Sequence, residues 1–337
     1  MNGTLQFVAI LVVIAILLDL YIISGWRRFR ALRQEQEKSG GAIHTIQLLK
    51  QAFSVNPGSR WGHFIQRVQF DTRVRAKLFV LLELGLLALW TLLICADYLD
   101  MNPHLVPAGR EFGSTIQTNH LWTQAMKCGW CAVWNGSEHG GYPALADIQG
   151  SMLHPITMVT TLLWGVVNGV KVTLILSLWL AGVAQWWIAR ELNLGWVPRM
   201  WSAGIAVAGG HLAGRMQLGM AGIVLSTAMA SLALAALIRL ARTGTRKDAV
   251  LFGIMTASAI VSGQGYIQIG LIGILPVAVL FFMEKDKRNT LAGWKNYLLA
   301  AGIALLLAAP LLVPLAHFSP NIVKNMDPEF QSAQPLS

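Results

Sequence analysis

Charged side chains at the borders of apolar stretches are the first candidates for chemistry in this sequence. Asp97 and Asp100 follow a long apolar run and lie three positions apart. Carboxylates in such a position could take a proton from an acceptor or bind a divalent cation. The alternative is that both residues only end a helix at the membrane interface.

Basic side chains also lie within or next to apolar runs. Lys171 falls inside the run at 164–189, where a charge costs about 2.5 to 3.5 kcal/mol at mid-bilayer. It must therefore extend to the interface, pair with another group or face a polar cavity. His211 and Arg215 are four positions apart, so they share one face of a helix. The flanking glycines permit close approach of a ligand, and these three residues are predicted to bind a phosphate.

A third polar group interrupts the apolar sequence at 262–268, where Gln264 and Gln268 stand among serine, glycine and tyrosine residues. Glycines here would also allow two helices to pack closely without any ligand. Both interpretations stay open, and the two glutamines are predicted to contribute to a binding site.

Cys128 and Cys131 form a Cys-x-x-Cys pair in a long polar loop. A zinc site would need two further ligands, for which His120 and His139 are the candidates. A disulfide bond is the other main possibility if the loop faces an oxidising compartment, and two free thiols are the third. The sequence leaves these alternatives open.

The rest of the sequence is predominantly apolar, with 55% hydrophobic and 12% charged residues. Runs close to the length of about 20 residues that crosses a bilayer recur along the chain. The predicted fold class is an all-α integral membrane protein with about eight transmembrane helices, at 5–26, 78–97, 166–189, 201–220, 223–240, 249–266, 269–283 and 297–315. The first run lacks a basic segment before it, so it is predicted to be a retained anchor.

Lysine and arginine residues predict the orientation of these helices. They crowd the loop at 27–77 and recur near 190–199, 239–247 and 285–295, which places these connections in the cytoplasm. Both termini and the loop at 98–155 are then external, in a multi-pass protein of the cell membrane. The net charge of +10 is explained by contact with anionic lipid, and no nucleic-acid partner is expected because no such motif is present.

The external loop contains a series of short motifs, and two further motifs follow it in the membrane region. In order, they are Leu121-Trp122, Trp134-Asn135, Gly140-Gly141-Tyr142-Pro143, Ala146-Asp147, His154-Pro155, Gly210-His211 with Arg215, and Gly263-Gln264-Gly265-Tyr266-Ile267-Gln268. Together they resemble bacterial membrane glycosyltransferases of the GT-C type, especially the YfhO-like group. The resemblance extends over about 78–319.

This resemblance implies a GT-C-like fold and the transfer of a sugar from a polyprenyl-phosphate carrier to an acceptor at the external membrane face. In such enzymes an acidic residue of the first external loop acts as base or metal ligand, and basic residues hold the lipid phosphate. Where many relatives carry an Asp before His120, this chain has Gln117-Thr118-Asn119. The implied catalytic residues are therefore Asp97, Asp100 and Glu111, and a divalent cation is a candidate cofactor. The implied substrate-binding residues are His120, Trp134, Asn135, Glu138, His139, Tyr142, Asp147, Lys171, His211, Arg215, Gln264 and Gln268.

The domain organisation suggests an alternative function. Residues 1–77 are predicted to form an additional anchor and basic cytoplasmic loop. Residues 78–319 form the GT-C-like domain, whose external loop carries short juxtamembrane helices, and residues 320–337 form an external tail. Relatives of this group lack the first span and continue beyond the last one, so an inactive or split accessory subunit with a membrane protein partner stays open. A lipid or solute transporter is a weaker alternative, because convincing repeats of broken helices are not visible.

Overall fold

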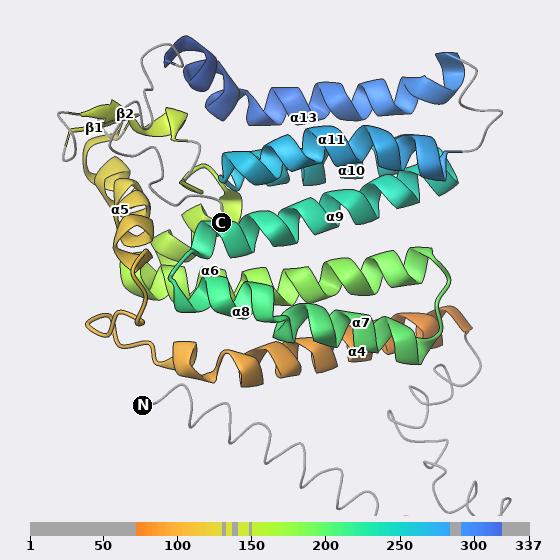
Figure 1. The fold of residues 1–337 in the computed structure, drawn as a ribbon, viewed down its shortest axis with the longest axis horizontal. Coiled ribbons are helices and arrows are strands. Elements are labelled where there is room, and N and C mark those ends of the chain that lie inside the picture. The colour runs from red at the N-terminus through yellow and green to blue at the C-terminus, as the bar shows by residue number, and fades with distance from the viewer. Residues whose placement is uncertain (1–71, 130–132, 137–140, 148–149, 284–290, 319–337) are drawn as a thin grey trace, which may run out of the picture. The chain divides into compact units, whose positions relative to one another are not determined.

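The computed structural model describes residues 72–129, 133–136, 141–147, 150–283 and 291–318 (Figure 1). The predicted anchor at 5–26, most of the basic loop and the tail at 320–337 lie outside the described residues. The chain divides into two compact units, Met1–Gly85 and Leu86–Ser337. Nearly all described residues belong to the second unit, and the predicted division between residues 77 and 78 stays a prediction.

The described residues are mostly helical. The helices are α4 (Thr72–Ile94), α5 (Phe112–Cys128), α6 (Pro155–Glu191), α7 (Trp196–Ala208), α8 (Gly210–Gln217), α9 (Ala221–Thr243), α10 (Arg246–Val261), α11 (Gly265–Phe282) and α13 (Leu291–Phe318). Between α4 and α6 the chain adds the 3-10 helices η1 (Ala96–Leu99) and η3 (Ala144–Ala146), and the antiparallel strands β1 (Trp134–Asn135) and β2 (Tyr142–Pro143). Within the second unit, α6, α9, α10, α11 and α13 run side by side (Figure 1).

Four helices in the described part of the chain are long and apolar enough to cross a membrane: Lys77–Ile94, Pro155–Glu191, Ala221–Thr243 and Trp294–Phe318. A further apolar stretch at Ile267–Phe282 is shorter. The chain is therefore a membrane-embedded helical protein. The number of eight spans, the GT-C fold and the side on which each loop lies stay predictions.

The predicted single span at 201–220 is wrong, because two short helices occupy these residues. Helix α7 ends at Ala208, and Gly209 has φ −61° and ψ 130°, an extended conformation that breaks the helix before α8. Successive glycines weaken a helix because they lose the most backbone freedom on ordering. Helix α10 ends at Val261, before residue 266, and there Gly263 and Gln264 turn the chain with positive φ values of 84° and 71°.

Helix α6 is two helical segments rather than one rod. Gly165 has φ 77° and ψ 179°, a conformation essentially restricted to glycine. The hydroxyl oxygens of Thr160 and Thr173 are only 2.7 Å apart, whereas residues 13 positions apart in a straight helix would be separated by about 20 Å. The first segment, 155–164, therefore folds back against the second, 166–191, and only the second corresponds to the span predicted at 166–189.

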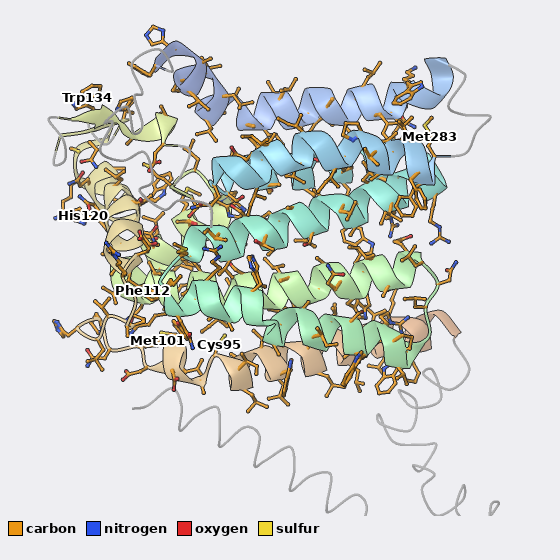
Figure 2. The ribbon with its side chains drawn as sticks, in the orientation of Figure 1. Cys95, Met101, Phe112, His120, Trp134 and Met283 are labelled. Carbon is orange, nitrogen blue, oxygen red and sulfur yellow. The ribbon has the colours of Figure 1, made fainter. Side chains whose placement is uncertain are left out.

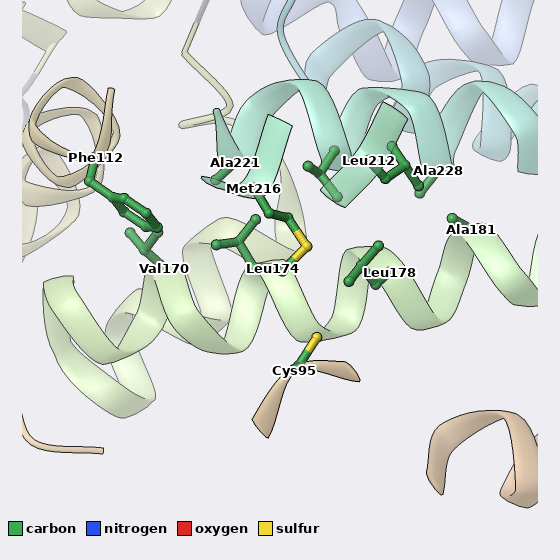
Figure 3. Packing of buried hydrophobic residues seen from close by; sticks show 11 residues of the cluster. Cys95, Phe112, Val170, Leu174, Leu178, Ala181, Leu212, Met216, Ala221 and Ala228 are labelled. Atoms are coloured by element: carbon green, nitrogen blue, oxygen red, sulfur yellow. The ribbon is translucent and has the colours of Figure 1, made fainter. Parts of the chain in front are cut away.

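The largest apolar contact joins α6 to α9 and to the short helices beside them. Leu174 and Leu178 of α6 lie in one cluster with Met216 of α8 and Val224 of α9, and Phe112 of α5 closes its end (Figure 3). This cluster anchors α8 and the start of α5 against the membrane helices. Because Leu212 and Met216 of α8 belong to the cluster, the cluster fixes the orientation of α8 and of its polar side chains His211 and Arg215.

An ion network joins α6, α9 and α10 at the ends of these helices that lie far from α5. Arg239 donates from Nε to Asp248 at 2.7 Å and lies 3.6 Å from Glu191, which also contacts Arg242 at 3.4 Å. Burial by itself would raise the pKa of Asp248. Hydrogen bonds from Thr243, Thr245 and Arg239, together with the charge of Arg239, outweigh this effect and lower that pKa.

Replacing Asp248 by asparagine should lower the free energy of unfolding at pH 7 by about 1–2 kcal/mol, because charge-assisted hydrogen bonds are lost. Since the folded-state pKa is depressed, this stabilisation is present above the ordinary carboxyl pKa of about 3.9 and is lost as the pH falls below it. Thermal unfolding in detergent at neutral and at strongly acidic pH measures both effects. An equal deficit of the Asn variant at both pH values would contradict the assignment, and Lys247→Ala at an exposed neighbouring position is the control.

Candidate functional site

A groove of about 310 Å³ lies between α8, α9 and α11. Its wall is mostly aliphatic. Helix α9 contributes the hydroxyl groups of Thr227 and Ser231, and helix α8 contributes the imidazole of His211 and the guanidinium of Arg215. The lining residues are His211, Arg215, Ile223, Thr227, Ala230, Ser231, Leu234, Ile267, Leu271 and Ile274. An apolar groove beside the cation of Arg215 fits an amphiphile with an anionic head group.

The sequence of α8 explains why the cation reaches this groove. Leu212 and Met216 occupy the face that is buried against α6 and α9, so His211 and Arg215, four positions apart, share another face. Arg215 is half-buried, and its guanidinium lies 3.4 Å from the sulfur of Met220. Among the described residues no carboxylate forms an ion pair with it. Both His211 and Arg215 line the groove.

The segment that carries Gln264 and Gln268 borders the same groove through Ile267. A hydrogen bond of 2.6 Å from the Ser226 hydroxyl of α9 to the Gly263 carbonyl holds this turn. The Gln268 amide donates to the carbonyl of Ile260, so it braces the turn itself. The contact of Ser226 with this turn was not predicted, because a single serine in an apolar run carries no distinctive signal.

Lys171 is placed differently from the prediction that grouped it with Arg215. It does not line the groove, and its residue is only 2% exposed. Its ammonium donates to the carbonyls of Asp100 and Asn102 at 2.6 and 3.0 Å, and Asn168 donates to the carbonyl between them at 2.7 Å. Lys171 therefore holds the loop after η1 against α6.

The segments that carry the three candidate catalytic carboxylates come close to α8 or α6. Asp97 and Asp100 are exposed, and the Asp100 carboxylate accepts from the backbone of Asn102 at 3.0 Å. Tyr98, beside Asp97, donates to the carbonyl of Met216 at 3.3 Å. The backbone of the half-buried Glu111 donates to Leu218 at 2.9 Å. Two of these segments thus attach to the end of α8, next to Arg215.

The remaining described loop residues of the prediction lie on α5, on the β-ribbon or directly after η3, and are not among the residues that line the groove. His120 is exposed on α5, with its Nδ1 3.0 Å from the Thr123 hydroxyl (Figure 2). The Trp134 indole packs over Gly141, and Asn135 is buried. The backbone of Tyr142 belongs to β2, the half-buried Asp147 follows η3 with its carboxylate against Gly150, and Glu138 and His139 lie outside the described residues.

The alternatives for the cysteine pair are narrowed by the structure. Cys128 is disulfide-bonded, which excludes a free thiol or a zinc ligand at this position. Over the ranges that the structure describes, no three His, Cys, Asp or Glu side chains are grouped as metal ligands. The divalent cation stays a prediction that concerns Asp97 and Asp100.

His154 is a further polar residue, which belongs to the His154-Pro155 motif but was not predicted as a site residue. It caps the start of α6, where its Nδ1 accepts from the backbone of Ile156 at 3.2 Å, and it is 2% exposed. Burial lowers the pKa of His154 to about 4, so its ring is neutral at pH 7. Pro155 at the first helical position was the available sequence signal for the start of this helix.

Comparisons with protein-family models, with curated proteins and with solved structures found no match to this chain. The resemblance to GT-C glycosyltransferases therefore depends on sequence motifs alone. The chemistry of the groove depends on its own geometry: an aliphatic wall, two hydroxyl groups and a guanidinium beside an imidazole. These groups suit binding of a lipid phosphate.

Proposed function

We propose that this protein binds a polyprenyl-phosphate-linked sugar in the groove and transfers the sugar to an acceptor at the external membrane face. The observation that carries the proposal is the mostly aliphatic groove that Arg215 and His211 help to line. The hydrocarbon chain packs against the aliphatic side chains of α9 and α11, and the phosphate meets Arg215 and His211. Arginine matches phosphate geometry and forms charge-assisted hydrogen bonds with it.

In this proposal the leaving group is the carrier phosphate, and Arg215 stabilises the negative charge that develops on it. A carboxylate takes the proton from the acceptor. Asp97 and Glu111 are the candidates, because the segments that carry them bond to the end of α8. Asp100 is the third predicted carboxylate, on the loop that Lys171 holds, and a divalent cation at Asp97 or Asp100 belongs to the same proposal.

The external position of this end of the molecule is also part of the proposal. The disulfide of Cys128 supports it, because disulfides form and persist in oxidising compartments. Exposed basic residues at the opposite helix ends, including Arg242, Arg246 and Lys247, support a cytoplasmic position there. Both observations favour the predicted orientation.

Binding of the carrier can be tested directly. In native mass spectrometry of the detergent-purified protein titrated with polyprenyl phosphate, Arg215→Ala should weaken binding about tenfold, because one charge-assisted contact contributes at least about 1.5 kcal/mol. Arg215→Lys should retain part of the affinity. Lys247→Ala removes the same charge away from the groove and is the matched control. Equal affinity of wild type and Arg215→Ala would reject the site.

Transfer is tested separately, with the carrier loaded with a labelled sugar and the protein reconstituted in vesicles with external membrane acceptors. We expect wild type to release the labelled sugar from the carrier. We expect Arg215→Ala to release none. Binding that depends on Arg215 without any release would instead favour the accessory-subunit alternative. A stable protein partner that co-purifies would favour it further.

A further inference from the structure

The first segment of α6, residues 155–164, has its polar and apolar faces reversed. The threonines at 157, 160 and 161 are buried, each at 1–2% exposure, whereas Leu163 at its end is 67% exposed. Val159, Leu162 and Trp164 are exposed as well. A helix on a water-facing surface shows the opposite pattern, with polar residues outward and apolar residues inward. Water is therefore not the medium that this outer face fits.

The polar inner face is matched by the second segment of the same helix and by Ser151 before its start. The Thr160 hydroxyl bonds to that of Thr173 at 2.7 Å, and Thr157 donates to Ser151 at 3.3 Å. A Cβ added to Gly169 would lie 2.8 Å from the Cα of Thr161, so the two backbones nearly touch. Close packing through small residues and hydroxyl groups is the mode by which helices associate inside lipid.

The length and turn of this segment limit where it can lie. Ten residues of helix rise about 15 Å, roughly half of the hydrocarbon core. The exposed turn at Gly165 is not helical, and such backbone is not tolerated in contact with the lipid core. Trp164 stands beside the turn, and tryptophan is enriched at membrane interfaces. The segment therefore suits the interface and does not cross the bilayer.

We infer that residues 155–164 form a half-helix embedded in the membrane interface, with Val159, Leu162, Leu163 and Trp164 in contact with lipid. The half-helix belongs to the same candidate membrane span as the segment 166–191. That second segment is packed inside the protein and has no exposed residue before Arg190, whereas the outer face of the half-helix is uncovered. The half-helix holds the preceding residues, including His154, at the membrane surface. This inference does not depend on the proposed transferase activity.

Spin labels measure this contact directly. A nitroxide on Leu163→Cys, in protein reconstituted into vesicles of phosphatidylcholine and phosphatidylglycerol, should collide readily with oxygen, which concentrates in lipid. It should collide rarely with a water-soluble nickel chelate. Val159→Cys is a second, independent position on the same face. Cys95 is buried and Cys128 is disulfide-bonded. Wild type treated with the same spin label measures the background labelling.

Two reference positions calibrate the result. Leu306→Cys on α13 is 74% exposed within a candidate membrane span, so it reports lipid. His104→Cys, in the exposed loop after η1, reports water. More oxygen and less nickel contact at Leu163 and Val159 than at His104, at a depth shallower than that of Leu306 in the middle of its span, supports the inference. Values equal to those of Leu306 would place the face in the hydrocarbon core and overturn the interfacial position. Accessibility that resembles His104 overturns it, and so does an immobilised label that neither reagent reaches, because the face would then be covered by protein.

Discussion

Replacing Lys171 by methionine should lower the free energy of unfolding by about 2–3 kcal/mol, because the carbonyls of Asp100 and Asn102 lose the ammonium group that donates to both. These two hydrogen bonds, at 2.6 and 3.0 Å, join the loop after η1 to α6. Methionine retains the length and flexibility of the side chain, so the cavity term is small. Removing a buried charge partly offsets the loss, which is why the expected cost is below the sum of two charged hydrogen bonds.

Thermal unfolding in detergent, combined with carrier binding, distinguishes this role from the one predicted for Lys171. We expect Lys171→Met to be less stable with nearly unchanged affinity for polyprenyl phosphate. The matched variant Arg215→Met should behave in the opposite way, since Arg215 lines the groove. Loss of carrier affinity in Lys171→Met at unchanged stability would show that Lys171 is a phosphate ligand after all.

Acidification should destabilise the protein through His154 in a defined pH range. Burial lowers the pKa of His154 from its ordinary 6.5 to about 4, so the unfolded chain takes up a proton before the folded protein does. The stabilisation is fully present above pH 6.5 and is lost as the pH falls toward about 4. The full loss is about 3 kcal/mol, from about 1.4 kcal/mol for each tenfold change in proton affinity.

The variant His154→Asn is the matched control for this titration. Asparagine is a strong helix-capping residue, so it can accept from the backbone of Ile156 as His154 does. We expect its unfolding temperature to change much less than that of wild type between pH 7 and about pH 4.5. A pH dependence equal to that of wild type would assign the titration to other groups. The contribution of Asp248 does not interfere, because it is lost only at lower pH.

Local sequence patterns were enough to predict several helices and the common helix face of His211 and Arg215. The apolar run at 223–240 predicted α9, which spans Ala221–Thr243, because its composition suits a membrane helix at nearly every position. The spacing of His211 and Arg215 was sufficient to place them on one face, since the periodicity of a helix is a local property. Both residues line one groove, and the binding of a phosphate there stays a proposal.

Other predictions failed where local signals compete. Hydropathy favoured one span over 201–220, but the glycines at 209 and 210 break it into α7 and α8. The sequence likewise contained Gly165, yet nothing local indicates that residues 155–164 fold back. That hairpin depends on the contact of Thr160 with Thr173 and on the fit of Gly169 against Thr161.

The sequence by itself determined that this is a helical membrane protein, because bilayer thickness imposes run lengths that composition reveals directly. It also determined which polar residues were unusual in that setting. Only the tertiary structure decided what each one contacts: Arg215 lines an apolar groove, whereas Lys171 bonds to a carbonyl 71 positions earlier in the chain. Such pairings depend on how separate helices pack, and the environment of a buried charge is set by that packing rather than by its neighbours in sequence.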